Sequence, residues 1–438
     1  MLTRFVTAGS VDDGKSTLIG RLLWDTRAVF EDQVVAISAA SQRRGQAQPD
    51  LSLLTDGLMA EREQGITIDV AYRYFNTAQR KFIVADCPGH EQYTRNMVTG
   101  ASNADVAVLL VDARKGLLPQ THRHAAVCGW LGLKRIVLAI NKIDLVDWSQ
   151  SRFEEIAREF RAWCEPLGLP EVIAVPVSAL TGDGVVFRGD QMAWYHGPTL
   201  LEILERPLAG ERNGVIDSGA AALPLRFPVQ WVIRGALEFD PDFRGVAGRI
   251  EAGTVHVGDE VLVQRDRALQ RARIAQICLG DQRLMMAQAG RSVTLRLDRE
   301  VDVSRGDWLV SASANQQPAL VDDLVAQICW FSDQPMRAGD RFLLKMGTRS
   351  VRAEVSAIEA LIDVETLRPN PVAAELGFVQ GSAQGSVQAN DLAKVRFALH
   401  EPLPVDRVGA HERLGVGSRF LLIDEATDIT VGAGVLRQ

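Results

Sequence analysis

The first 205 residues of this chain alternate short apolar runs with longer stretches of helical periodicity. The apolar runs are rich in β-branched residues and show no clean period of two, which is typical of strands buried on both faces of a parallel sheet. The expected strands are residues 4–9, 81–86, 105–112, 135–141 and 172–178, and the expected helices are residues 15–26, 91–101, 121–132 and 152–163. This alternation predicts a doubly wound α/β domain with a mostly parallel sheet over residues 1–210.

The rest of the chain has a different pattern. Residues 206–224 are rich in Gly, Ala, Ser and Pro and are expected to form a linker. Beyond them, short strands are set between glycine-containing turns, with almost no pattern of helix length. This predicts two antiparallel β-barrel domains, at residues 222–315 and 319–438. Size alone also favours several domains, since 438 residues exceed what one hydrophobic core usually supports.

The loop after the first expected strand, GSVDDGKST, has the form G-x-x-x-x-G-K-[ST]. Because it follows a strand and opens a helix, its backbone N–H groups and the helix dipole converge on phosphate groups. Lys15 is expected to reach the β- and γ-phosphate oxygens, and the Ser16 hydroxyl to bind Mg²⁺. The residues expected to contact the nucleotide here are Gly9, Ser10, Val11, Asp12, Asp13, Gly14, Lys15, Ser16 and Thr17.

A second motif, DCPGH, ends the expected strand at residues 81–86. Asp86 is placed to hold Mg²⁺ through water, and the backbone N–H of Gly89 can approach the γ-phosphate because glycine has no side chain. His90 follows directly and is expected to orient the attacking water. The residues assigned to the site from this motif are Asp86, Cys87, Pro88, Gly89 and His90.

Two further motifs select the base. In NKID, the Asp144 carboxylate can accept hydrogen bonds from the ring N–H and the exocyclic amine of guanine, a donor pair that adenine lacks. In SAL, a backbone N–H near Ala179 can meet the guanine carbonyl oxygen. The residues assigned to base binding are Asn141, Lys142, Ile143, Asp144, Ser178, Ala179 and Leu180. In this order, each at the end of a successive strand, the motifs predict GTP and GDP rather than ATP as ligands.

The segment AEREQGITIDVAY, residues 60–72, lies between the first two motifs. Thr67 is expected to add a second hydroxyl ligand to Mg²⁺ when a γ-phosphate is present, which makes the predicted metal set Ser16, Thr67 and Asp86. A plain edge strand is the alternative, and both interpretations are kept, with Thr67 as ligand and the following residues as strand. His122 and His124 lie in a helical stretch without a partner pattern and are expected to be surface or packing residues.

With these motifs, the first domain resembles the translational GTPases, and residues 60–72 and DCPGH are similar to Tu-type elongation factors. The whole chain more closely resembles the GTPase large subunits of bacterial sulfate adenylyltransferase. That resemblance is carried by GSVDDGKSTLIGRLL, DCPGHEQYTRNMVTGAS, WYHGPTLLEILE (194–205), DFRGVAGRI (242–250), LLKMGTRSVRAEV (343–355) and FLLIDEATDITVGAG (420–434).

The resemblance implies that the chain binds and hydrolyses GTP and couples the hydrolysis to adenylyl transfer between ATP and sulfate. That transfer, which forms adenosine 5′-phosphosulfate, belongs to a separate small catalytic subunit, so a heterodimer or a higher assembly is expected. Some members of the family continue into an adenylylsulfate kinase domain with its own phosphate-binding loop. This chain contains a single G-x-x-x-x-G-K-[ST], so any such kinase is expected to be separate or absent. Cys87 stands where the family commonly has threonine.

The two carboxylates in an anion-binding loop call for separate explanations. The translational GTPases usually have an acid at the position of Asp12, and we expect Asp12 to help bind a monovalent cation, K⁺, beside the phosphates, with a carbonyl from the region of Gly65. That cation would be a fixed positive charge on the transition state, which makes Asp12 a catalytic residue beside Lys15 and His90. Asp13 is expected to be solvated or to face a partner.

Charge and composition indicate which kinds of partner and which location the protein has. A net charge of −7 and a basic stretch at residues 264–276 without interleaved aromatics disfavour nucleic-acid binding. No apolar run reaches the roughly 18 residues of a membrane span. Five cysteines without C-x-x-C spacing indicate reduced thiols and a cytoplasmic protein. The alternatives that stay open are an elongation-factor-like carrier of aminoacyl-tRNA and a regulatory GTP-binding module that rarely turns over.

Overall fold

The computed structural model describes residues 2–29, 34–35, 37, 41, 49–54, 69–90, 93–165, 171–208, 221–235, 243–313, 317–370, 385–406 and 417–436. The chain divides into two compact units. The first comprises Met1–Leu208 with Asp363–Arg368, and the second comprises Ala209–Ile362 with Pro369–Gln438. The limits expected for the three domains stay predictions. Among the described residues, no helix combines the length and the apolar character that crossing a membrane would require.

The first unit is built on a six-stranded sheet with the order β2-β3-β1-β4-β5-β6. All pairings are parallel except that of β2 with β3, which is antiparallel. The strands are β1 (Leu2–Gly9), β2 (Ala71–Asn76), β3 (Lys81–Asp86), β4 (Val106–Asp112), β5 (Arg135–Asn141) and β6 (Val172–Pro176). The five predicted strands and the mostly parallel sheet are therefore confirmed, and β2 is an edge strand.

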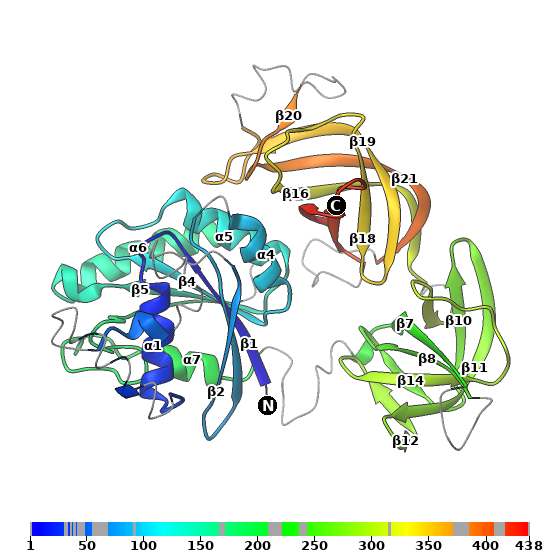
Figure 1. Cartoon of the computed structure of the whole chain (residues 1–438), viewed down its shortest axis with the longest axis horizontal. Coiled ribbons are helices and arrows are strands. Elements are labelled where there is room, and N and C mark those ends of the chain that lie inside the picture. Colours follow the sequence, from blue (N-terminus) through cyan, green and yellow to red (C-terminus); the bar gives the residue numbers. More distant parts are fainter. Residues whose placement is uncertain are drawn as a thin grey trace. The chain divides into compact units, whose positions relative to one another are not determined.

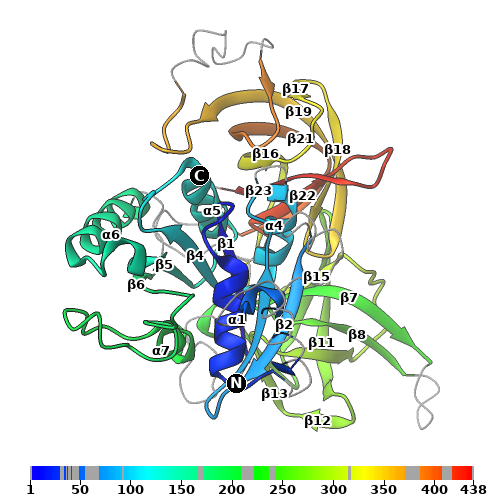
Figure 2. The same ribbon diagram turned by 60° about the vertical axis from the view of Figure 1, so that its left-hand side comes forward.

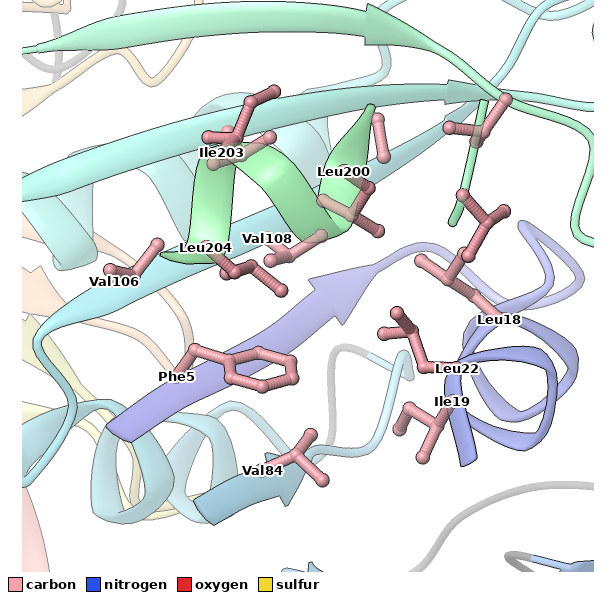
Figure 3. Close-up of a cluster of buried hydrophobic side chains, with 14 of the residues drawn as sticks. Phe5, Leu18, Ile19, Leu22, Val84, Val106, Val108, Leu200, Ile203 and Leu204 are labelled. Carbon is pink, nitrogen blue, oxygen red and sulfur yellow. The ribbon is translucent and has the colours of Figure 1, made fainter. Parts of the chain in front are cut away.

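Helices connect the parallel strands, as the alternation predicts, whereas β2 and β3 are joined by a turn (Figures 1 and 2). They are α1 (Lys15–Asp25), α4 (Thr94–Ser102), α5 (Pro119–Trp130), α6 (Gln150–Cys164) and α7 (Leu200–Glu205), with 3-10 turns η1 (Leu51–Leu54) and η3 (Ile143–Val146). Figure 3 shows apolar side chains of α1 and α7 packing on the same face of the sheet around Phe5. The helix α4 lies on the other face, where a Cβ on Gly100 would stand 3.5 Å from the Cβ of Ala85. Strands β4 and β5 are buried along their whole length because helices cover both faces.

The second unit contains two closed antiparallel barrels, as predicted (Figure 1). The first closes in the order β10-β15-β7-β8-β14-β11, because β11 pairs back with β10, and β12 is attached to β11. Its strands are β7 (Arg226–Arg234), β8 (Arg244–Arg249), β10 (Glu260–Arg265), β11 (Ala268–Leu279), β12 (Gln282–Leu284), β14 (Ser292–Leu297) and β15 (Trp308–Ser311), with β9 (Thr254–His256) paired to β13 (Met286–Gln288). Closure leaves no unpaired edge on the six-strand ring.

The second barrel closes in the order β16-β21-β19-β18-β22-β23, with β23 paired to β16. Its strands are β16 (Ala319–Trp330), β18 (Arg341–Met346), β19 (Arg349–Ile362), β21 (Leu392–Val405), β22 (Arg419–Ile423) and β23 (Thr430–Leu436), beside a short pair of β17 (Met336–Arg337) and β20 (Ser386–Val387). Each barrel surrounds its own cluster of buried apolar side chains. The architecture is therefore a nucleotide-type α/β unit followed by two β-barrels.

Candidate functional site

The four motifs meet at one edge of the first unit's sheet. Each follows the carboxyl end of a strand, and parallel strands present those ends on the same side, where α/β proteins bind their ligands. The register places Thr7 of β1 beside Asp86 of β3, and Asp112 of β4 beside Asn141 of β5. The two motifs expected to bind phosphates, GSVDDGKST and DCPGH, thus follow β1 and β3, and we call them the phosphate-type motifs. The two motifs expected to bind the base, NKID and SAL, follow β5 and β6, and we call them the base-type motifs.

The first loop joins β1 to the amino end of α1. Gly14 has a φ of 92°, and a Cβ there would stand 2.5 Å from Asn141 Nδ2, so both the conformation and the space require glycine. Lys15 is 7% exposed, and its ammonium donates to the carbonyl oxygens of Gly9 (3.0 Å) and Ser10 (2.8 Å). Burial lowers the pKa of Lys15, while the Asp86 carboxylate opposes that effect. The Lys15 ammonium is therefore held by carbonyl groups of its own loop.

Asp13 is not solvated, and the expectation for it is wrong. Its side chain is buried, and Oδ2 accepts a hydrogen bond of 2.7 Å from the backbone N–H of Ser10. Burial raises the pKa of Asp13 to about 6, although Lys15 acts to lower it. Among the described residues, its Oδ1 has no hydrogen-bond partner. The carboxylate therefore braces the loop across its width, which a sequence pattern does not reveal.

Asp12 is arranged differently from its neighbour. It is exposed and has a left-handed φ of 68°, and its backbone carbonyl accepts a hydrogen bond from the Lys142 ammonium. The Gly65 carbonyl that was expected to share a cation with Asp12 lies outside the described residues. Of the two adjacent carboxylates, one is exposed and the other supports the loop from within.

The second motif lies directly against the first. A Cβ on Gly89 would stand 2.7 Å from the carbonyl oxygen of Gly9 and 3.0 Å from the carbonyl carbon of Ser10. Asp86 is 2% exposed and accepts a hydrogen bond of 3.2 Å from the Thr7 hydroxyl. Because only glycine fits this contact, the backbone at Gly89 follows the phosphate-type loop closely.

Four more residues of the two phosphate-type motifs, and the predicted metal ligand Thr67, are described next. Ser16 and Thr17 are half-buried in the first turn of α1. His90 is half-buried, with its ring 6.1 Å from that of Tyr93 in an edge-to-face arrangement. Burial raises the pKa of the Cys87 thiol, which keeps it neutral. Thr67, the third predicted metal ligand, lies outside the described residues.

Asn141 joins three of the motifs. Its side chain is 2% exposed; Nδ2 donates to the carbonyl oxygen of Asp13 (2.7 Å), and Oδ1 accepts from the backbone N–H of Ala179 (2.9 Å). The N–H of Ala179 itself is therefore paired with Asn141 in this structure, and the expectation that a backbone N–H near Ala179 meets the guanine carbonyl stays a prediction. Asp144 lies on η3, and its Oδ1 is buried without a hydrogen-bond partner among the described residues. That oxygen is an acceptor suited to a ligand donor.

Two charged groups around the site were not predicted. Asp112 is 1% exposed and pairs with Lys142 at 3.1 Å and with Arg114, whose Nη2 lies 2.6 Å from its Oδ2. Desolvation acts to raise the pKa of Asp112, but hydrogen bonds from Arg114 and Lys142 outweigh it and hold the pKa well below its usual range. Its position at the end of a buried strand, like that of Asp86, was a signal that could have found it.

Arg21 is the second missed group. From α1 it donates to the carbonyl oxygens of Ala179 (3.2 Å, from Nε) and Leu180 (2.5 Å, from Nη2). It thereby ties the SAL loop to the helix that follows the phosphate-type loop. Its partners lie 158 and 159 residues away along the chain, and no local sequence signal indicates them.

The two histidines of α5 are packing residues, and the surface alternative is wrong. His124 is fully buried, and burial lowers its pKa to about 3. The His122 ring stacks on Trp163 with centroids 4.7 Å apart. Neither histidine belongs to the four motifs.

Comparisons with known proteins support the architecture of the chain. Residues 2–209 match the family described as elongation factor Tu GTP binding domain, and residues 323–437 match the GTP-eEF1A C-terminal domain-like family. Sulfate adenylyltransferase subunit 1 of Vibrio campbellii is 46% identical over 443 residues, covering 100% of this chain and 86% of that protein. The same subunit of Cellvibrio japonicus is 45% identical over 438 residues, covering 99% and 86%.

A longer relative shares the same region. The bifunctional enzyme NodQ of Rhizobium sp. is 45% identical over 437 residues, which cover 99% of this chain and 63% of that protein. The similarity to all three relatives therefore extends over the α/β unit and both barrels.

Proposed function

Because the chain belongs to the sulfate adenylyltransferase subunit 1 family, we propose that it is the GTP-binding and GTP-hydrolysing large subunit of a sulfate adenylyltransferase. It couples GTP hydrolysis to the formation of adenosine 5′-phosphosulfate from ATP and sulfate. Similarity to this family over the whole chain favours this function over an elongation-factor-like carrier of aminoacyl-tRNA.

The observation that supports the nucleotide assignment is that the Oδ1 of Asp144 is buried and has no hydrogen-bond partner in the part of the chain that the structure describes. An unpaired buried acceptor costs stability unless a ligand donor meets it. Guanine offers two adjacent donors, the ring N–H and the exocyclic amine, whereas adenine offers an acceptor at the corresponding ring position. A site built around Asp144 therefore selects guanine nucleotides.

Residue roles follow from the placement of each motif. Lys15 leaves the carbonyls of its own loop to meet the β- and γ-phosphate oxygens, while loop N–H groups bind the remaining phosphate oxygens. Gly89 approaches the γ-phosphate through its backbone N–H. His90, next to it, orients the attacking water. Lys142 holds the base loop to Asp12 and Asp112.

Mg²⁺ is the metal that these residues fit. The Ser16 hydroxyl and the Asp86 carboxylate are hard oxygen donors, and Thr67 would add a second hydroxyl. Among the described residues, no group of three or more His, Cys, Asp or Glu side chains forms a dedicated metal cage. Mg²⁺ in nucleotide sites is held by one or two protein oxygens together with phosphates and water, so the donor set is sufficient. When bound, it neutralises charge on the β- and γ-phosphates.

The exposed Asp12 carboxylate is proposed to hold K⁺ beside the phosphates, as a fixed positive charge during hydrolysis. GTPase rates in potassium and in a large organic cation test this role, with Asp12→Ala as the matched variant. A potassium stimulation that Asp12→Ala lacks would support it. Equal rates of the unaltered chain in both cations would refute it.

The partner that we propose is a separate small catalytic subunit that performs the adenylyl transfer, in a heterodimer or a larger assembly. No role in nucleic-acid binding is proposed, because the net charge is −7. A cytoplasmic location is supported by the five cysteines, all of which are free thiols.

The test is a coupled assay with the small subunit, ATP and sulfate, with and without GTP. We expect GTP to raise the yield of adenosine 5′-phosphosulfate beyond the uncoupled equilibrium. Lys15→Ala is the control that should abolish this increase, because it removes the cation facing the transferred phosphate. A yield that does not respond to GTP would exclude the coupling function.

A further inference from the structure

We propose that Trp194 is a positioning residue for guanine recognition, because it holds the loop that carries Asp144. This inference rests on the proposed guanine site and adds a residue outside the four motifs. Trp194 lies in the stretch between β6 and α7, at the start of the segment WYHGPTLLEILE. No nucleotide contact is assigned to Trp194 itself.

The loop after β5 is held in an unfavourable backbone conformation. It passes through Lys142 with a φ of 59°, then η3, and then two consecutive residues with left-handed φ, Asp147 at 53° and Trp148 at 48°. Each left-handed residue other than glycine is disfavoured by a steric contact of its Cβ. Such conformations persist where surrounding contacts hold them. The position of Asp144 on η3 therefore depends on contacts behind the loop.

Trp194 supplies such a contact. Its indole N–H donates a hydrogen bond of 2.8 Å to the carbonyl oxygen of Trp148. The indole ring lies 5.4 Å from the ring of Phe153 on α6 and 5.9 Å from that of Tyr195. The Tyr195 hydroxyl in turn donates to the Pro198 carbonyl at 2.9 Å. Because the rings fix the indole, its N–H holds the strained end of the Asp144 loop in place.

The same stretch also supports the SAL loop. The backbone N–H of Ser178 donates to the carbonyl of Asp183 at 2.9 Å, and the Thr181 hydroxyl donates to the Asp183 carboxylate at 2.8 Å. The N–H of Leu200 then bonds the Gly184 carbonyl at 2.9 Å, which connects this turn to α7. Both base-binding loops are thus hydrogen-bonded to residues in the range 181–200. Trp194 contacts the loop of Asp144, so replacing Trp194 should change how the site binds the base.

This role predicts a change in base preference, which a general loss of stability would not produce. Asp144 can accept two hydrogen bonds from guanine but only one from hypoxanthine, which lacks the exocyclic amine. A displaced Asp144 therefore weakens GDP binding more than IDP binding. A defect confined to the phosphate-binding end of the site would weaken the binding of GDP and of IDP equally.

The experiment measures dissociation constants of Mg·GDP and Mg·IDP by calorimetry for the whole chain, Trp194→Phe and Trp163→Phe. We expect Trp194→Phe to weaken GDP binding about tenfold, equivalent to about 1.4 kcal/mol, and IDP binding about threefold. Trp163→Phe is the matched control, because the Trp163 indole nitrogen has no hydrogen-bond partner among the described residues. It should leave both constants unchanged.

A folded Trp194→Phe protein with the GDP-to-IDP preference of the unaltered chain would overturn the inference. If that variant does not fold, Phe153→Leu removes the ring beside Trp194 but keeps the indole N–H, and a smaller fall in the same preference is expected. An unchanged preference in Phe153→Leu would overturn the inference equally. If the unaltered chain shows no preference for GDP over IDP, the guanine site itself is refuted, which is a separate outcome.

Discussion

The substitution Asn141→Ala removes the side chain that links the phosphate-type loop to both base-type loops. It leaves the Asp13 carbonyl and the Ala179 N–H without their partners at 2.7 Å and 2.9 Å. Each buried group left unpaired costs about 1–3 kcal/mol, so the two together cost about 2–6 kcal/mol. Domains of this kind are stable by about 5–15 kcal/mol, so the variant should be clearly less stable but folded over most of that range, and the unfolding measurement decides it. Both groups lie in loops to which we assign nucleotide binding, so GDP affinity should fall at least tenfold.

The assay combines a fluorescent GDP titration with urea unfolding of the same preparations. Asn76→Ala is the matched control, since Asn76 lies exposed at the end of the edge strand β2, and it should change neither measurement. A second variant, Asn141→Asp, keeps an oxygen to accept from Ala179 but cannot donate to Asp13. The reasoning is refuted if folded Asn141→Ala binds GDP within threefold of the unaltered chain, because the three motifs would then be held together by other contacts.

Three further predictions follow from single residues. Asp144→Asn should shift the nucleotide preference from GTP toward xanthosine triphosphate, since an amide can donate to the carbonyl that replaces the guanine amine; competition binding with both triphosphates checks this. Gly89→Ala should slow GTP hydrolysis at least tenfold and should also weaken GDP binding, because its Cβ would overlap Lys15 Nζ and stand 2.7 Å from the Gly9 carbonyl oxygen; parallel single-turnover and GDP-binding measurements decide it. His124 is buried with a folded-state pKa of about 3, below the ordinary 6.5, so the native state binds fewer protons than the unfolded chain between these values. Its contribution to stability is therefore complete above pH 6.5 and is lost as pH falls. Between pH 7.5 and pH 5.5 the free energy of unfolding should fall by about 1.4 kcal/mol more in the unaltered chain than in His124→Gln, because other titrating groups such as Asp13 contribute equally to both proteins.

Local chemistry in the sequence was enough to define the strands and the placement of the motifs. A strand buried on both faces has an apolar, β-branched composition whatever its neighbours are, so β1, β3, β4, β5 and β6 could be identified without a structure. The phosphate-type loop has a φ of 92° at Gly14, where a Cβ would also meet Asn141, and the motif G-x-x-x-x-G-K-[ST] already places glycine at that position. Because parallel strands end on one side of a sheet, motifs at strand ends were expected to converge.

The depth and the partner of each side chain were decided by the tertiary structure. Asp12 and Asp13 are adjacent and chemically identical, yet one is exposed and the other is buried against the N–H of Ser10. The sequence does not distinguish them, because burial depends on which way the loop turns. His124 was placed in the correct helix, but the packing that removes it from solvent comes from elsewhere in the fold.

Contacts between distant segments are the other part that only the fold determined. Asn141 reaches Asp13 across 128 residues, and Trp194 reaches Trp148 across 46. Hydrogen bonds of this kind depend on distances between loops that meet only after the sheet has formed, and no local periodicity encodes them. The residue types at the ends of the strands were therefore sufficient to predict a guanine-nucleotide site, whereas the contacts that hold its loops in place required the assembled sheet.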